Sequence, residues 1–301
     1  MTQNAELWFR NEAVVDFDAM AGRLRQILGS DIEMQEVEGG RMFAHKDHVV
    51  AYEEGEQGPA ITAVLVLDSG EEEVDDSPLA ESCQSEVQQS WRCSEAQSLV
   101  DQGRHALVVL EMLTRSLGAE LRLKLFHATI EAALQECDAE ALVFRSSQQV
   151  IARDDYLGDL ELDAVQRAGA LNVRIFQVDG ESGVSSVMDT YGMEALGLHD
   201  IQCHFRDLAP EDVARALFNT AYYVVEKGAV IEEGNTVNGL EEDQQWVCSF
   251  RKSLASPHRR VLDLDPGDPY AAGQRAGDAE EPPELEEAEE LEEPEKPESP
   301  E

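Results

Sequence analysis

The first residues that could do chemistry form a short run of histidines and glutamates. His45 and His48 are three positions apart, and Glu53 follows five residues later. Imidazole nitrogens and carboxylate oxygens make an adequate ligand set for zinc, iron or manganese. Because neighbouring side chains of a strand point to opposite faces, His45 and His48 could share a metal only across a turn or bulge. The alternative is two histidines near the start of a strand, one of them exposed.

A second group combines histidine, aspartate and cysteine. His199 and Asp200 precede an alternating segment that contains Cys203 and His204, whose side chains must point to opposite faces of a strand. A nucleophilic thiolate needs a cationic neighbour or a helix N-terminus to lower its pKa. Cys203 and Cys248 instead occupy apolar positions of alternating patterns, so we interpret both as buried core thiols.

Two loops that contain glycine could approach each other and shape a pocket. One holds Thr190 and Gly192, and the other holds Asn235 and Thr236. The simpler interpretation is that glycine supplies the positive φ of a tight turn. The candidate pocket residues are Thr190, Gly192, His199, Asp200, Asn235 and Thr236.

The common catalytic motifs are missing from the sequence. It contains no GxSxG, HExxH, GxxxxGKS/T or GxGxxG pattern, which argues against the commonest hydrolase and nucleotide-binding classes. We therefore predict no catalytic residue and no cofactor, and we expect a non-catalytic protein-binding or regulatory module. The alternative function is a metal-dependent hydrolase that uses His45, His48, Glu53 or His199.

The charge balance bears on the partners. The 301 residues include 63 acidic and 23 basic ones, giving a net charge of -40. Residues 277–301 hold 13 acidic residues and one lysine, so the rest of the chain keeps a net charge of -28. Such a surface repels the phosphates of nucleic acids and anionic membranes, and we expect neither as a partner. We expect an unidentified protein partner, and the charge favours a basic one.

Composition also bears on the compartment. The five cysteines match neither a disulfide framework nor a zinc-binding spacing. The N-terminus lacks the basic start and apolar run of a signal peptide, and no stretch approaches the ~18 apolar residues of a membrane span. We expect a cytoplasmic protein.

The elements that must position these residues alternate between strands and helices. Apolar spacing predicts helices at 17–28, 82–91, 94–103, 118–137, 155–168 and 210–227. It predicts strands at 7–9, 42–52, 60–67, 105–113, 141–151, 173–178, 187–190, 201–206, 230–231 and 246–250. Asp16 should cap the first helix and Gly29 should end it. His127 and the three tryptophans, Trp8, Trp91 and Trp246, are expected in the core or at its edge.

The order of elements predicts a mixed α/β to α+β fold. We expect one or two mixed sheets with helices packed on one side, in two pseudo-related halves. The predicted units are residues 1–80, a β-α-β-β unit, and residues 81–252, an α/β unit. An extended segment should follow at 253–276, with the basic cluster Ser256–Arg260 in a solvated loop or paired with acidic groups. Residues 277–301, rich in Glu and Pro, should be disordered.

The stretch Met188–Gly239 resembles a known bacterial family. That family, domain of unknown function 4261, carries a Thr-x-Gly-Leu-x-x-Leu-Gly stretch, a helix with a late Tyr, and a Gly…Gly-Asp-Thr stretch. The matching positions are Thr190, Gly192, Leu196, Gly197, Tyr223, Gly228, Gly234 and Thr236. Met193 stands where the family usually has Leu, and Asn235 where it usually has Asp. The resemblance extends loosely over residues 80–240 and implies a compact α/β or α+β protein without an assigned activity.

Overall fold

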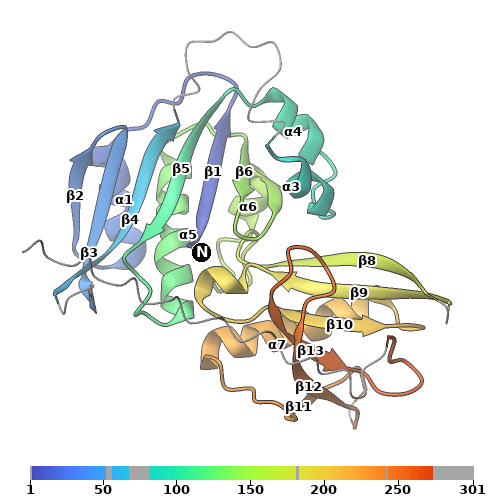
Figure 1. The fold of residues 1–301 in the computed structure, drawn as a ribbon. Helices are drawn as coiled ribbons and strands as arrows, with labels where there is room; N and C mark the ends of the chain where they lie inside the picture. The colour runs from blue at the N-terminus through green and yellow to red at the C-terminus, as the bar shows by residue number, and fades with distance from the viewer. Residues whose placement is uncertain (1, 52–55, 68–81, 181–182, 242, 274–301) are drawn as a thin grey trace, which may run out of the picture.

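The computed structural model describes residues 2–51, 56–67, 82–180, 183–241 and 243–273 of the chain. Two β-sheets lie side by side, each with its own helices (Figure 1). The mixed α+β fold predicted from the sequence is confirmed. The predicted acidic tail, residues 277–301, lies outside the described residues.

The first sheet has seven strands in the order β2-β3-β4-β5-β1-β6-β7, all antiparallel. Its strands are β1 (Asn4–Phe9), β2 (Ile32–Val37), β3 (Gly40–Ala51), β4 (Gln57–Leu67), β5 (His105–Met112), β6 (Ala141–Phe144) and β7 (Gln149–Ala152). β5 lies between β4 and β1, so this sheet takes strands from both sides of residue 80. The division predicted at residue 80 therefore does not coincide with a division between the sheets.

Helices pack on both faces of the first sheet, whereas we expected them on one side. Helices α1 (Phe17–Leu28) and α5 (Ala119–Gln135) share a core with Leu107 and Leu142. Helices α3 (Gln84–Gln89) and α4 (Ala96–Gln102) lie at the opposite face, where α4 packs against Trp8 and Val143. The helix α6 (Arg153–Gly158) follows β7.

Local signals explain the start and end of α1. Asp16 accepts a hydrogen bond from the backbone N–H of Ala19 at 3.0 Å, which satisfies one of the free donors of the first turn. Gly29 has φ 62°, a left-handed conformation that glycine adopts without the steric penalty of a Cβ atom. Both predicted roles are confirmed.

The second sheet has six strands in the order β11-β12-β13-β10-β9-β8. They are β8 (Asn172–Gly180), β9 (Gly183–Tyr191), β10 (Ile201–Phe205), β11 (Thr236–Asn238), β12 (Gln245–Lys252) and β13 (Arg260–Asp265). Only β10 and β13 pair in parallel; the other neighbours are antiparallel. The helix α7 (Pro210–Lys227) covers one face, and the short 3-10 helix η2 (Met193–Leu196) follows β9.

Several predicted elements differ from those observed. Residues 253–276, expected to be extended, contain the strand β13, which is almost entirely buried between β12 and β10. The strand expected at 141–151 is a hairpin, β6–β7, because the chain turns at Gln148, where φ is 53°. The helix expected at 155–168 ends at Gly158, and its apolar residues Leu160 and Ala168 pack from turns instead. The strand expected at 230–231 does not form.

A buried ion pair joins the two sheets. Arg122, in the first turn of α5, donates to Glu111 of β5, with Nε 2.5 Å from Oε1. The same guanidinium donates to the backbone oxygen of Ala195 in η2 at 2.7 Å. Arg122 therefore fixes the first sheet against the loop that follows β9 of the second.

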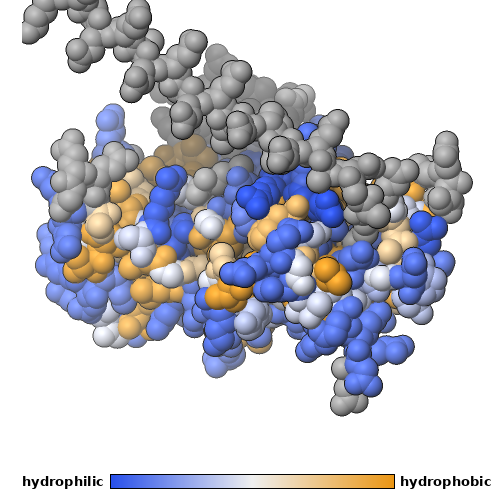
Figure 2. All heavy atoms as spheres, turned by 60° about the horizontal axis from the view of Figure 1, so that its bottom comes forward, coloured by the Kyte–Doolittle hydropathy of each residue, from blue (hydrophilic) through white to orange (hydrophobic). Residues whose placement is uncertain are grey.

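The surface seen in Figure 2 is mostly hydrophilic, with small apolar patches separated by polar side chains. Among the described helices, none is long and apolar enough to cross a membrane.

Candidate functional site

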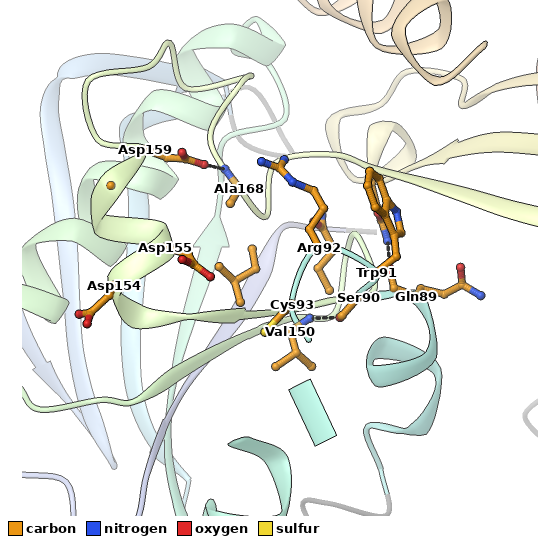
Figure 3. A pocket seen from close by; sticks show the side chains of 14 residues that line it. Gln89, Ser90, Trp91, Arg92, Cys93, Val150, Asp154, Asp155, Asp159 and Ala168 are labelled. Carbon is orange, nitrogen blue, oxygen red and sulfur yellow. Dashed lines mark hydrogen bonds between the residues drawn. The ribbon is translucent and has the colours of Figure 1, made fainter. Parts of the chain in front are cut away.

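A pocket opens where the two sheets meet. It has a volume of about 380 Å³, within the range of small ligand sites. The α3–α4 connection, β7, α6 and the first residue of β8 contribute to its lining. Figure 3 shows Asp155 and Asp159 on one wall and Trp91 on the opposite wall, with Arg92 between them and Asp154 pointing away.

Trp91 is the most unusual residue of this pocket. We expected it in the core or at its edge, yet its side chain is 60% exposed. The other two tryptophans, Trp8 and Trp246, are fully buried as expected. The indole Nε1 of Trp91 donates to the backbone oxygen of Val173 in β8 at 3.0 Å. A large aromatic ring is therefore held in place while one face stays open to solvent.

The charged groups of the pocket come from two segments. Asp154 and Asp155 lie in the first turn of α6 and are exposed. Asp159 accepts a hydrogen bond from the backbone N–H of Ala168 at 3.1 Å, which fixes its carboxylate. Arg92 is exposed and offers guanidinium donors beside these carboxylates. Acids outnumber bases in the lining, so the pocket favours a cationic group.

The buried floor of the pocket is already hydrogen-bonded. Ser90 Oγ accepts from the backbone N–H of Val150 and donates to the backbone oxygen of Glu86, both at 2.6 Å. Asn172 Nδ2 donates to the backbone oxygens of Gln89 and Gln148. These contacts hold the α3–α4 connection against β7 and β8. The groups left for a ligand are those at the rim.

Cys93 gives the pocket little nucleophilic character. Burial raises the pKa of its thiol above the ordinary value, so the neutral thiol prevails at physiological pH. The pocket can therefore bind an aromatic-stacking or cationic group, but its cysteine is not an activated nucleophile.

The residues predicted as a pocket are brought together only in part. Thr190 Oγ1 donates to Asp200 Oδ1 at 3.2 Å and accepts from the backbone N–H of Ile201 at 2.8 Å. Gly192, between β9 and η2, has φ 123°, which glycine alone adopts readily. Asp200 also accepts from the backbone N–H of Met193 at 3.2 Å. Thr190, Gly192 and Asp200 thus form one buried turn.

Arginines fill the space beside this turn. Arg259 donates from Nε to Asp200 at 2.8 Å and from Nη2 to Asp189 at 2.9 Å. Arg174 donates to the same Asp189 through both Nε and Nη2. Each guanidinium also lies against the ring of Tyr191, at 4.3 Å for Arg174 and 4.9 Å for Arg259. The basic segment 256–260 thus pairs with the acidic body through a buried arginine.

Burial dominates the electrostatics of this network. It raises the pKa of Asp200 to about 6, although the attraction of Arg259 opposes the shift. Two arginines face two aspartates, and all four side chains are hydrogen-bonded within the network. We interpret it as a structural network that fixes the 253–259 segment on the sheet, since no donor is left aimed at open space.

The other predicted pocket residues lie elsewhere. His199 packs edge-on against the ring of Phe250 at 5.2 Å. Asn235 accepts a hydrogen bond from the backbone N–H of Glu232, and Thr236 begins β11. Three strands separate β11 from β9, so the two glycine-containing loops do not meet across the sheet.

The candidate metal ligands have the following places. His45 is buried in β3, with Nε2 2.9 Å from Thr62 Oγ1, and burial lowers its pKa to about 4. The pairing of β3 with β4 shifts between His45 and Val49, which is the bulge that a shared metal would require. His48 is partly exposed, and Glu53 lies outside the described residues. Within the described ranges, no group of three or more His, Cys, Asp or Glu side chains could hold a metal ion.

Other core assignments are confirmed. His127 is buried in α5, with Nδ1 2.7 Å from the hydroxyl of Tyr156. Cys203 and Cys248 are buried thiols, and burial raises the pKa of Cys248 to about 11. The metal-dependent hydrolase alternative stays a prediction that elemental analysis of the purified protein would test.

The fold and the pocket define a two-sheet α+β protein with an acidic, aromatic recess at the sheet junction. Residues 189–265 match the model of the family described as Domain of unknown function (DUF4261), which confirms the resemblance seen in the sequence. The matched part runs from β9 to β13 and contains the Asp189, Asp200 and Arg259 network. No curated protein and no solved structure matches the chain.

The residues of the pocket at the junction were missed by sequence reasoning. Trp91 was expected in the core or at its edge, because tryptophan is highly buried on average. The helix predicted at 82–91 included Trp91, whereas the observed helix α3 ends at Gln89 and leaves Trp91 in the connection to α4. Nothing in the sequence joins this loop to Asp155 and Asp159, since only the fold brings the two segments together.

Proposed function

We propose that the protein is a non-catalytic protein-binding module that receives a cationic side chain of a basic partner in the Trp91 pocket. One observation carries this proposal. The Trp91 indole is 60% exposed, is fixed by its hydrogen bond to Val173, and lies across a recess from Asp155 and Asp159, with Arg92 between them.

The chemistry of these groups fits a lysine or arginine of a partner. An ammonium or guanidinium over the face of Trp gains roughly 0.5–2 kcal/mol, depending on how far it is desolvated. The carboxylates of Asp155 and Asp159 supply charge-assisted acceptors for the same cation. Exposed tryptophans with arginine beside them are also the residue types that contribute most to protein interfaces.

The charge of the whole chain supports the same kind of partner. A net charge of -40 attracts basic proteins at long range and raises their association rate at low salt. The pocket, at about 380 Å³, accommodates one or two side chains rather than a folded surface. The partner must therefore make further contacts outside the pocket.

Binding of fluorescein-labelled hexalysine to the full chain tests this proposal. Trp91→Ala and Asp155→Asn should each weaken binding about 5- to 30-fold, the equivalent of roughly 1–2 kcal/mol. Glu36→Gln is the matched control for Asp155→Asn, since it removes one exposed carboxylate from β2 at the far edge of the first sheet. It should leave the affinity within about twofold, because a distant surface charge is screened.

The acidic residues 277–301 can also bind hexalysine, but every variant carries them. Their contribution to the affinity therefore cancels when two variants are compared. Equal losses for Asp155→Asn and Glu36→Gln would contradict the proposal, because only overall charge would then matter. Unchanged binding by Trp91→Ala would contradict it as well.

A further inference from the structure

The outer edge of β8 carries the second contact that such a partner needs. Resting on the proposed function, we propose that an extended segment of the partner pairs with β8 as an added strand and places its lysine or arginine in the Trp91 pocket. Strand addition to an open sheet edge is a common mode of peptide recognition, in which main-chain hydrogen bonds supply the affinity.

The orientation of the β8 backbone follows from two hydrogen bonds. The oxygen of Val173 accepts from Trp91, which lies outside the sheet. The oxygen of Val178 accepts from the side-chain hydroxyl of Ser185, its register partner on β9, so this oxygen points toward β9. Because backbone groups alternate along an antiparallel edge, Ile175 and Gln177 point their N–H and C=O groups outward, as Val173 does. No described residue hydrogen-bonds to these outward groups of Ile175 and Gln177.

The other edges of the two sheets are protected, in so far as the described residues show. The edge strand β2 carries Glu33 and Glu36, and Glu33 pairs with Lys46 at 2.7 Å. The backbone N–H of Val150 in β7 donates to Ser90, so the α3–α4 connection covers that edge. β11 has only three residues. Charge, cover and short length are the usual devices against unwanted strand pairing. β8 has nine residues, its charged residues are Arg174, which is buried, and Asp179, and no described residue covers the outward groups of Ile175 and Gln177.

Residues 175–178, in the middle of this edge, carry no charge. Residues 175–178 read Ile-Phe-Gln-Val, in a chain with a net charge of -40. Ile175 is 44% exposed and Val178 is 36% exposed, while Val184 on the paired strand β9 is 66% exposed. Figure 1 shows the β8–β9 hairpin extending away from the body of the molecule, so a strand can approach it from the side.

The open edge is continuous with the pocket. Asn172, the first residue of β8, lines the pocket, and Trp91 binds the next residue, Val173. A strand advances about 3.3 Å per residue, so a segment paired at Ile175 lies about 7 Å from the Trp91 contact. Arg92 can donate to a carbonyl oxygen of the same segment, because its guanidinium is exposed beside Trp91. The ligand is thus an extended segment with apolar residues in its body and a lysine or arginine near one end.

A random dodecapeptide library displayed on phage, selected against the full chain, tests this inference. Synthetic copies of the enriched peptides should contain lysine or arginine beside alternating apolar residues. On binding, they should slow hydrogen exchange of the Ile175 and Gln177 amides by at least about tenfold, as expected for newly hydrogen-bonded edge amides. This measurement uses the unmodified protein and does not depend on any variant folding.

A matched pair of variants tests the role of the backbone. Gln177→Pro removes an outward N–H, whereas Gln177→Ala changes the side chain and keeps that donor. We expect Gln177→Pro to weaken peptide binding at least about fivefold, the equivalent of about 1 kcal/mol for one net hydrogen bond, and Gln177→Ala to bind within about twofold.

The outcomes separate this inference from the proposed function. Peptides whose binding depends on Trp91 and Asp155, but which leave the Ile175 and Gln177 amides unprotected, would overturn strand addition and leave the proposed function standing. Peptides that protect β8 but are insensitive to Trp91→Ala would overturn the proposed function instead. Failure to enrich any peptide would overturn the inference. Amide protection that grows with the concentration of the protein alone would also overturn it, because the β8 edge would then pair with a second copy of the chain.

Discussion

At the scale of single residues, the buried histidines make stability depend on pH. His45 and His127 are both fully buried, and burial lowers their pKa values to about 4 and about 3. In the unfolded chain each would titrate near the ordinary pKa of about 6.5. Below that pH the unfolded state binds protons that the folded state does not, so the free energy of unfolding falls as the pH falls.

His45→Gln isolates one of these groups. Glutamine cannot titrate, and its amide can still hydrogen-bond to Thr62. Between pH 7.5 and pH 4, we expect the free energy of unfolding of the natural sequence to fall by about 3 kcal/mol more than that of the variant. Urea unfolding at several pH values measures the difference. Parallel pH profiles for the two proteins would show that His45 titrates normally in the folded state.

At the scale of elements, the position of the 253–259 segment depends on one side chain. Arg259 is 8% exposed and binds both Asp189 and Asp200, which are buried. Arg259→Met would leave Asp189 paired with Arg174 and would remove the arginine that pairs with Asp200. We expect it to lower the free energy of unfolding by about 3–5 kcal/mol, the usual cost of a buried charge that loses its partner.

Arg260→Ala is the control for that change, because Arg260 is exposed and its guanidinium lies over the ring of Phe250. Its expected cost is about 1 kcal/mol or less. Chemical denaturation of the two variants gives both values. A cost for Arg259→Met no larger than that for Arg260→Ala would contradict the structural role of the network.

The elements that could be predicted are those whose signals are local. The periodic apolar face, Asp16 and Gly29 define α1 without reference to the rest of the chain. β13 escaped prediction because Pro257 and Pro266 flank it, and because four consecutive buried residues give it no alternation between apolar and polar positions. β7 was merged with β6 because a turn through Ser146 and Gln148 carries no glycine or proline signal.

For the predicted site too, the sequence indicated only contacts between residues that are close in the chain. Thr190, Gly192 and Asp200 are close together because they surround one turn, and the sequence indicated that proximity. It could not indicate that Arg259 fills the neighbouring space, since this depends on the parallel pairing of β10 with β13. The Trp91 pocket depends on the junction of two sheets, and no periodicity within one segment describes such a junction.

At the scale of the whole molecule, the negative charge and the open β8 edge have different roles in the proposed binding. The charge of the chain attracts basic partners without selecting among them. Selection must come from fixed groups, and Trp91, in the α3–α4 connection, is fixed by its hydrogen bond to Val173 of β8. The pair Arg122 and Glu111, with its contact to Ala195, joins the first sheet to the loop that follows β9.

The central claim is that the Trp91 indole binds a cation, and a titration of the full chain with hexalysine followed by NMR tests it most directly. Three tryptophans give three indole N–H signals, and the signal missing from Trp91→Phe identifies Trp91. We predict that this signal shifts on titration, while the signals of the buried Trp8 and Trp246 stay in place. A Trp91 signal that does not move at saturation, or equal shifts of all three signals, would contradict the claim.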